Sequence, residues 1–167
     1  SHVCTNCIAG KFAIEAGMAE CVDCAIGMFA ETAGSPVCSM CAPGKIAATN
    51  GSAVCLDCEA GKIASAESMG ACTACPAGTI AADDGLDICT ACPAGRFASG
   101  SSSSVCESCI PGKFSALEGS STCTNCEAGY YAAEGLATTC HACALGTITA
   151  QDGTPTCTDC QPGTIAG

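Results

Sequence analysis

The cysteines of this chain follow a fixed period of 17 residues, and this period constrains the fold more than any other feature. Each repeat begins with a pair of cysteines separated by two residues, and no insertion or deletion separates one repeat from the next. The first cysteines of the pairs are Cys4, Cys21, Cys38, Cys55, Cys72, Cys89, Cys106, Cys123, Cys140 and Cys157. A short and constant period is typical of stacked arrays, in which each unit contacts its neighbours along the chain.

The composition predicts that covalent bonds hold this array together. Twenty of the 167 residues are cysteine, whereas there are four Phe, two Tyr and no Trp. With so few large apolar residues, a single repeat cannot become ordered by burial alone. We therefore predict a small disulfide-rich repeat array, an elongated rod or solenoid of short irregular β-hairpins with little or no helix.

The repeats also predict the domain organisation. Residues 1–3 fit the tail of a preceding repeat, residues 4–156 form nine complete repeats, and residues 157–167 form a tenth, truncated repeat. Both ends of the chain carry ordinary repeat sequence instead of a polar cap. We expect the native array to continue at both ends, so that this chain is a window of a longer one.

Two positions, counted from the first cysteine of each repeat, predict local structure. Position 7 is Gly in all ten repeats and directly follows Pro at Gly44, Gly112 and Gly163, which predicts a type II turn with a positive φ. Position 9 is Phe, Ile or Tyr, from Phe12 to Ile165, and we expect it to pack against the cysteine sulfurs. Positions 8–11 and 15–17 are β-prone and are expected to flank a second turn of varying type, because several repeats lack its glycine.

Three alternatives to disulfides fit these cysteine pairs poorly. A thioredoxin-like redox site uses one pair at the start of a helix, and covalent haem needs a His directly after the pair, whereas His141 lies inside one. Zinc held by four cysteines would favour an alternation of odd and even repeats, and positions 7, 9 and 10 show none. Disulfides formed in an oxidising compartment are the favoured interpretation.

Uniform spacing leaves three disulfide registers open. A pair could close on itself (Cys4 with Cys7), the second cysteine could bond the first of the next pair (Cys7 with Cys21), or the outer cysteines could cross (Cys4 with Cys24). Closure within one pair constrains the chain very little. A Cys7–Cys21 bond would close a ring of about 15 residues, which contributes about 3 kcal/mol in the chain-entropy account.

The repeat pattern resembles that of known cysteine-rich modules. The pattern C-x-x-C-x-x-G-x-[FIY]-[AST], as in residues 72–81 and 89–98, resembles the ephrin-receptor-like cysteine-rich repeat, and it is similar to the C-P-x-G-x-Y module that opens tumour-necrosis-factor-receptor repeats. Those receptors mix modules of different lengths, whereas this array never breaks its period. Long uniform arrays of this repeat occur in surface and secreted proteins of protists and algae. The resemblance therefore implies a secreted or cell-surface location, with no particular ligand.

The resemblance also favours one disulfide register. In the receptor module the cysteine before G-x-Y bonds the next cysteine downstream. The pairs expected from it are Cys7 with Cys21, Cys24 with Cys38, Cys41 with Cys55, Cys58 with Cys72, Cys75 with Cys89, Cys92 with Cys106, Cys109 with Cys123, Cys126 with Cys140, and Cys143 with Cys157. Cys4 and Cys160 are then left to continue the ladder into flanking repeats.

The charge distribution limits the partners. A net charge of −11 disfavours nucleic acid, and no apolar run approaches the length of a membrane span, so we expect neither in this window. The acidic residues gather in the second turn without the spacing of a calcium loop. Every Lys and Arg lies at position 8, and we interpret this basic line as a solvated strand face in preference to a docking edge. Its members are Lys11, Lys45, Lys62, Arg96 and Lys113.

Hydroxyl and amide side chains in the second turn predict glycosylation. Asn50-Gly51-Ser52 is the single N-x-[ST] sequon, so we expect an N-glycan at Asn50. Residues 101–104, 120–122 and 154–156 place Ser and Thr on equivalent turns, where O-glycans could be attached.

The sequence predicts a non-enzymatic structural protein without a cofactor, because no nucleophile, base and orienting group recur together. The favoured function is a rod that forms or coats an extracellular filament or surface appendage, with further repeats, other copies or fibre proteins as partners. The alternative is the stalk or ligand-binding ectodomain of a receptor-like surface protein. A ligand site needs a patch unlike its neighbours, and the departures from uniformity, at residues 100–104, 130–131 and His141, are scattered along the sequence.

Overall fold

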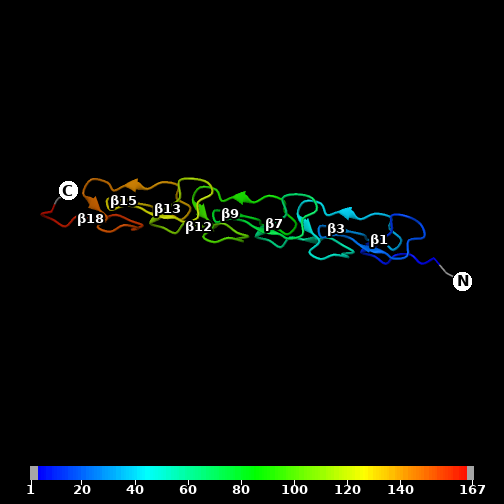
Figure 1. Ribbon diagram of the computed structural model, residues 1–167. Coiled ribbons are helices and arrows are strands. Elements are labelled where there is room, and N and C mark those ends of the chain that lie inside the picture. Colours follow the sequence, from blue (N-terminus) through cyan, green and yellow to red (C-terminus); the bar gives the residue numbers. More distant parts are fainter. Residues whose placement is uncertain (1–3, 165–167) are drawn as a thin grey trace. The chain divides into compact units, whose positions relative to one another are not determined.

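The protein, seen in a computed structural model that describes residues 4–164, is built from nine small antiparallel β-hairpins (Figure 1). Each strand has two residues, and the residues described contain no helix. The strands are β1 (Lys11–Phe12), β2 (Val22–Asp23), β3 (Met28–Phe29), β4 (Ser39–Met40), β5 (Lys45–Ile46), β6 (Leu56–Asp57), β7 (Lys62–Ile63), β8 (Thr73–Ala74), β9 (Thr79–Ile80), β10 (Thr90–Ala91), β11 (Arg96–Phe97), β12 (Glu107–Ser108), β13 (Lys113–Phe114), β14 (Thr124–Asn125), β15 (Tyr130–Tyr131), β16 (His141–Ala142), β17 (Thr147–Ile148) and β18 (Thr158–Asp159). This confirms the disulfide-rich array of hairpins expected from the sequence.

The hairpins are distributed over two compact units. The first unit comprises the described residues up to Cys75 together with Ala81–Cys89, and contains the hairpins β1–β2, β3–β4, β5–β6 and β7–β8. The second comprises Pro76–Ile80 together with the described residues from Thr90 onward, and contains the five hairpins from β9–β10 to β17–β18. Within each unit the hairpins follow one another in chain order (Figure 1).

Each hairpin joins positions 8 and 9 of one repeat to the two residues between the cysteines of the next. In the first hairpin Lys11 lies opposite Asp23, and Phe12 lies opposite Val22. The expectation that positions 15–17 form the second strand was therefore wrong. The β-branched residues at position 17 instead lie on the surface, as does Val37, a residue that is 59% exposed. The disulfide explains the difference, because it places the next cysteine pair beside the first strand.

The turn at position 7 has the conformation that its glycine predicts. The φ angle of this glycine lies between 80° and 87° in all ten repeats. The N–H at position 8 donates to the carbonyl at position 5, as Lys11 does to Ile8 at 3.1 Å and Met28 to Ala25 at 2.9 Å. A four-residue turn closed by this bond, with a positive φ at its third residue, is a type II turn, so the prediction is confirmed.

The second turn keeps one conformation even where its glycine is missing. Position 14 has a φ between 58° and 81° in nine repeats, of which six have Gly there. The other three have Ser68, Ser102 and Leu136 at 58°, 60° and 68°. The expectation that the turn varies in type was therefore wrong. Neighbouring repeats hold the backbone here, since the N–H of Leu136 donates to the carbonyl of Cys109 at 3.0 Å and that of Ser68 to Cys41 at 2.9 Å.

Leu136 is a site of stored backbone strain, and its replacement should stabilise the second unit. A left-handed conformation costs an L-residue about 1–2 kcal/mol relative to glycine. Because much of the Leu136 side chain is exposed, little burial is lost on its removal. We expect Leu136→Gly to raise the free energy of unfolding by about 1 kcal/mol, measured by denaturant unfolding or local hydrogen exchange. Leu136→Ala is the control and should give no such gain, since alanine keeps the strain.

The buried core consists of cysteine and alanine instead of the large apolar residues. The second cysteine of each pair is buried at Cys24, Cys41 and Cys58, and so is the small residue at position 10, such as Ala30 and Ala64. Position 9 is only half-buried in eight of the nine described repeats, and Ile165 lies outside the described residues. The packing of position 9 against the cysteine sulfurs stays a prediction, and the fully buried side chains are those of the cysteines and of position 10. The carbonyl at position 10 accepts a hydrogen bond from the position-7 N–H of the preceding repeat, as Ala30 does from Gly10 at 2.8 Å, so the backbones of adjacent repeats lie close together here.

Candidate functional site

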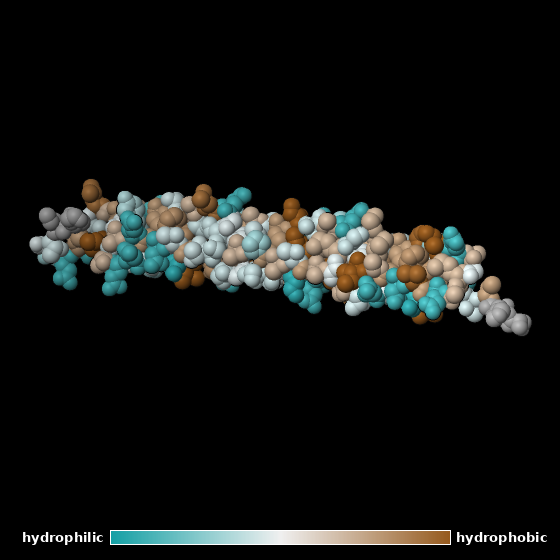
Figure 2. Space-filling view, in the orientation of Figure 1, coloured by the Kyte–Doolittle hydropathy of each residue, from teal (hydrophilic) through white to brown (hydrophobic). Residues whose placement is uncertain are grey.

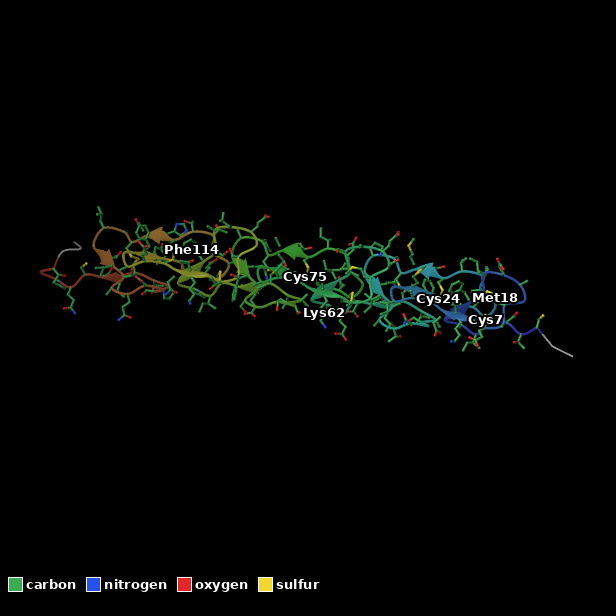
Figure 3. All side chains as sticks on the ribbon, viewed as in Figure 1. Cys7, Met18, Cys24, Lys62, Cys75 and Phe114 are labelled. Atoms are coloured by element: carbon green, nitrogen blue, oxygen red, sulfur yellow. A yellow bond between two sulfur atoms is a disulfide. The ribbon has the colours of Figure 1, made fainter. Side chains whose placement is uncertain are left out.

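The disulfide ladder is the feature that every hairpin shares. The second cysteine of each pair bonds the first cysteine of the next pair, 14 residues later, with Cα atoms 5.6–5.8 Å apart. The bonds are Cys7–Cys21, Cys24–Cys38, Cys41–Cys55, Cys58–Cys72, Cys75–Cys89, Cys92–Cys106, Cys109–Cys123, Cys126–Cys140 and Cys143–Cys157. In Figure 3, Cys75 lies within the ribbon whereas Lys62 lies at its edge.

The two remaining cysteines are the ends of this ladder. Cys4 is exposed and Cys160 is half-buried, and neither forms a disulfide in residues 4–164. Their assignment as links to flanking repeats stays a prediction.

Each disulfide is surrounded by backbone hydrogen bonds that join the same two repeats. Beside Cys24–Cys38, four N–H groups donate across the junction: Gly27 to Ala47 (2.9 Å), Cys41 to Gly27 (2.9 Å), Ala30 to Ser52 (3.2 Å) and Gly51 to Cys24 (2.8 Å). The second unit repeats this set beside Cys92–Cys106: Gly95 to Ser115 (2.8 Å), Cys109 to Gly95 (2.9 Å), Ala98 to Ser120 (3.2 Å) and Gly119 to Cys92 (2.7 Å). Because the bonds are between backbone atoms, the junction tolerates different surface side chains.

Repeats that are not adjacent also touch, through the two turns. A β-carbon added to Gly44 would lie 1.9 Å from the carbonyl oxygen of Gly85, and one added to Gly112 would lie 1.9 Å from that of Gly153. These pairs join position 7 of one repeat to position 14 of the repeat two places later. At Gly44 and Gly112, position 7 therefore needs glycine for two reasons, its positive φ and the absence of space for a side chain, whereas at Gly146 only the positive φ requires it.

A further contact between repeats, which the sequence analysis missed, involves Asn or Asp at position 13. The Oδ1 atom of Asn50 accepts a hydrogen bond from the backbone N–H of Ile26 at 3.1 Å. Asp84 accepts in the same way from Ala60 at 2.8 Å, and Asp152 accepts from Ala128 at 3.0 Å. The recurrence of Asn or Asp at position 13 was the signal that could have revealed this contact.

The predicted N-glycan at Asn50 can be tested without disturbing this contact. Asn50→Asp removes the sequon and keeps an Oδ1 acceptor, as Asp84 shows. We expect the natively expressed Asn50 protein to exceed its polypeptide mass by one glycan, and Asn50→Asp to lose that excess while keeping its stability. Intact mass spectrometry measures the difference. Equal excess mass in both proteins would assign the glycan elsewhere.

The basic line at position 8 is largely paired with acidic side chains. Lys11 Nζ lies 2.7 Å from Asp23, Lys45 Nζ lies 2.5 Å from Asp57, and Lys62 Nζ lies 3.6 Å from Glu59. The first two pairs are cross-strand neighbours in their hairpins. Because these pairs lie on the surface, each contributes less than about 1 kcal/mol to folding. The pairing favours a solvated strand face over a basic docking edge.

One hairpin differs from the others in its side chains. The hairpin β15–β16 holds both tyrosines of the chain, and Tyr131 lies opposite His141 with ring centroids 6.0 Å apart and planes tilted by 50°. Tyr130 lines one cavity of 260 Å³, whereas Tyr131 and His141 line another of 390 Å³. Two of the departures from uniformity, residues 130–131 and His141, thus meet in one hairpin, whereas residues 100–104 lie outside it.

Part of the second unit is similar in sequence to a known protein family. Residues 112–160, which include this hairpin, match the family described as "Tyrosine-protein kinase ephrin type A/B receptor-like". This stretch, which contains several of the 17-residue repeats, is similar to the ephrin-receptor-like family. The match confirms the resemblance seen in the sequence, and the regular period of nine disulfides agrees with it. No curated protein matches the chain in sequence.

The match and the disulfides together are typical of a disulfide-rich module of extracellular or secreted proteins. In the part of the chain that the structure describes, no three His, Cys, Asp or Glu side chains are grouped to hold a metal ion. Residues 4–164 also contain no apolar helix of membrane-spanning length.

Proposed function

We propose that the chain is a structural array that forms or coats an extracellular filament or cell-surface appendage. The observation that carries this proposal is the repeated junction, in which one disulfide and a set of backbone hydrogen bonds join each repeat to the next. Such a contact is heterologous, because the two faces that meet are different, and it can be extended by adding repeats without closing on itself. Further repeats, other copies and fibre proteins are the expected partners.

The exposed surface supports an array that remains soluble until it assembles. Many large apolar side chains are exposed, and on the face that Figure 2 shows they form separate brown groups with tan, white and teal surface between them. Acidic residues outnumber basic residues by 16 to 5. Separate apolar side chains on an acidic surface disfavour nonspecific clustering, so assembly would depend on defined contacts.

Electron microscopy of the intact native assembly, labelled with an antibody against this chain, tests the structural proposal. We expect label along filaments or an appendage at regular intervals. The proposal would be rejected if the label were spread over the cell surface with no filament present and the purified protein were monodisperse in solution.

A second candidate function is the ligand face of a receptor-like ectodomain. The observation that favours it is the hairpin β15–β16, where Tyr130, Tyr131 and His141 line two cavities. A surface that differs from its repeat-equivalent neighbours is what a discrete binding site requires.

A further inference from the structure

The cavity beside Tyr130 combines aromatic and acidic side chains. It has a volume of 260 Å³ and lies in the second unit, between successive hairpins. Its lining residues are Phe114, Thr124, Asn125, Glu127, Tyr130, Thr139 and Cys140. Phe114, which is labelled in Figure 3, is half-buried, whereas Tyr130 is 46% exposed and Glu127 is also exposed. A ligand could therefore reach both rings and the carboxylate from solvent.

The charge around this cavity is negative. Glu127 is the one charged side chain that lines it. Asp152 lies nearby, since its Oδ1 atom accepts a hydrogen bond from the N–H of Ala128, the residue after Glu127. From residue 114 to the end the sequence has five acidic residues and neither Lys nor Arg. The nearest base along the chain, Lys113, lines the neighbouring cavity and not this one, although it lies opposite Asn125 in the hairpin β13–β14.

That neighbouring cavity, one repeat earlier, has the same construction and different chemistry. Its volume is 180 Å³, and each of its residues lies 17 positions before its counterpart. Its lining residues are Phe97, Glu107, Ser108, Ile110, Lys113, Thr122 and Cys123. Ile110 replaces Glu127, and Lys113 replaces Tyr130. The earlier cavity thus has Lys113 together with the acid Glu107, whereas the later cavity has the acid Glu127, a second aromatic ring and no lysine.

We propose that the cavity lined by Phe114, Glu127 and Tyr130 binds a cationic side chain, a lysine or arginine, presented by a basic segment of a partner protein. Aromatic faces attract cations by about 0.5–1 kcal/mol each at exposed sites, and an adjacent carboxylate adds to this attraction. The asparagine and threonine side chains supply hydrogen-bond acceptors for the ammonium or guanidinium N–H groups. This inference rests on the second candidate function and names its class of ligand. It does not depend on filament formation, because one chain carries the whole cavity.

Nuclear magnetic resonance titration of the oxidised, isotope-labelled chain tests the proposal with Nα-acetyl-lysine N-methylamide as the probe. We expect saturable shifts at Asn125, Glu127 and Tyr130 with a dissociation constant on the order of millimolar. The same compound acetylated on Nε is neutral and should bind at least about tenfold more weakly, because it has no charge for the rings and the carboxylate. Equal binding of the two compounds would reject a cation site.

Two variants and a neutral sugar complete the test. Tyr130→Lys should abolish the shifts, because it puts a lysine where the earlier cavity has Lys113, and that lysine would repel the cationic probe. The double variant Ile110→Glu, Lys113→Tyr should create a second site around Phe97, whose shifts appear 17 residues earlier. All the changed side chains lie on the surface or line an open cavity, so unchanged dispersion of the remaining signals confirms folding.

If methyl glucoside bound at Tyr130 and the lysine probe did not, the ligand would not be a cation, although the second candidate function, ligand binding, would still hold. Absence of any saturable shift up to about 50 mM probe would overturn the site itself.

Discussion

Reduction of the disulfides is expected to unfold the whole array under conditions in which the oxidised chain is stable. Each bond closes a ring of about 15 residues and contributes about 3 kcal/mol in the chain-entropy account. The nine rings follow one another along the chain without overlap, so their contributions add to roughly 27 kcal/mol. This exceeds the about 5–15 kcal/mol by which whole domains are usually stable. The core that would remain is made of alanine and the freed cysteines.

Nuclear magnetic resonance spectra before and after reduction measure this effect, with loss of signal dispersion as the expected result.

A variant that lacks one disulfide then measures the contribution of that bond to its own hairpin. Cys58→Ser with Cys72→Ser should destabilise the hairpin β7–β8 by about 3 kcal/mol, seen as faster hydrogen exchange around that junction. Cys160→Ser is the matched control, because Cys160 forms no disulfide in the described residues. A reduced chain that kept its dispersion would show that the backbone hydrogen bonds suffice to hold the array.

Replacement of Gly112 by alanine is expected to break the contact between repeats two places apart. Its φ of 85° costs alanine about 1–2 kcal/mol. In addition, the new β-carbon would lie 1.9 Å from the carbonyl oxygen of Gly153, so one of the two backbones must move. A backbone atom cannot turn aside as a side chain can. We therefore expect a total loss of about 3 kcal/mol or more.

Gly146→Ala separates these two causes, because Gly146 has nearly the same φ, 84°, and no atom within 4 Å of an added β-carbon. It should lose only the about 1–2 kcal/mol of backbone strain. Local hydrogen exchange at the N–H of Gly153, which donates to Cys126, reports the difference. If both variants lost the same stability, contact between the turns would contribute nothing to the array.

The two candidate functions make different demands on the same junction. A structural array needs junctions that are alike, and the equivalent hydrogen bonds beside Cys24–Cys38 and Cys92–Cys106 meet that need with little dependence on surface side chains. A ligand site needs one repeat to differ, and Tyr130 and Glu127 supply that difference. Because the junction leaves the surface free to vary, one array can perform both roles.

The sequence by itself determined the local and covalent features of this protein. The 17-residue period predicted an array, and glycine at position 7 predicted a turn with positive φ, because that conformation depends on one residue and its immediate neighbours. The resemblance to receptor modules implied the register of Cys7 with Cys21, the bond that the structure contains.

Only the tertiary structure decided which segments meet. The partner strand of Phe12, the burial of Ala30 in place of Phe29, and the positive φ of Leu136 all depend on bonds between residues in different repeats. The meeting of Phe114 with Tyr130 has the same origin. Residue type predicts none of these, because the backbone of a neighbouring repeat determines the space and the hydrogen-bond partners at each position. At Leu136 the hydrogen bond to the neighbouring repeat holds a positive φ that leucine itself disfavours, so the backbone there is strained.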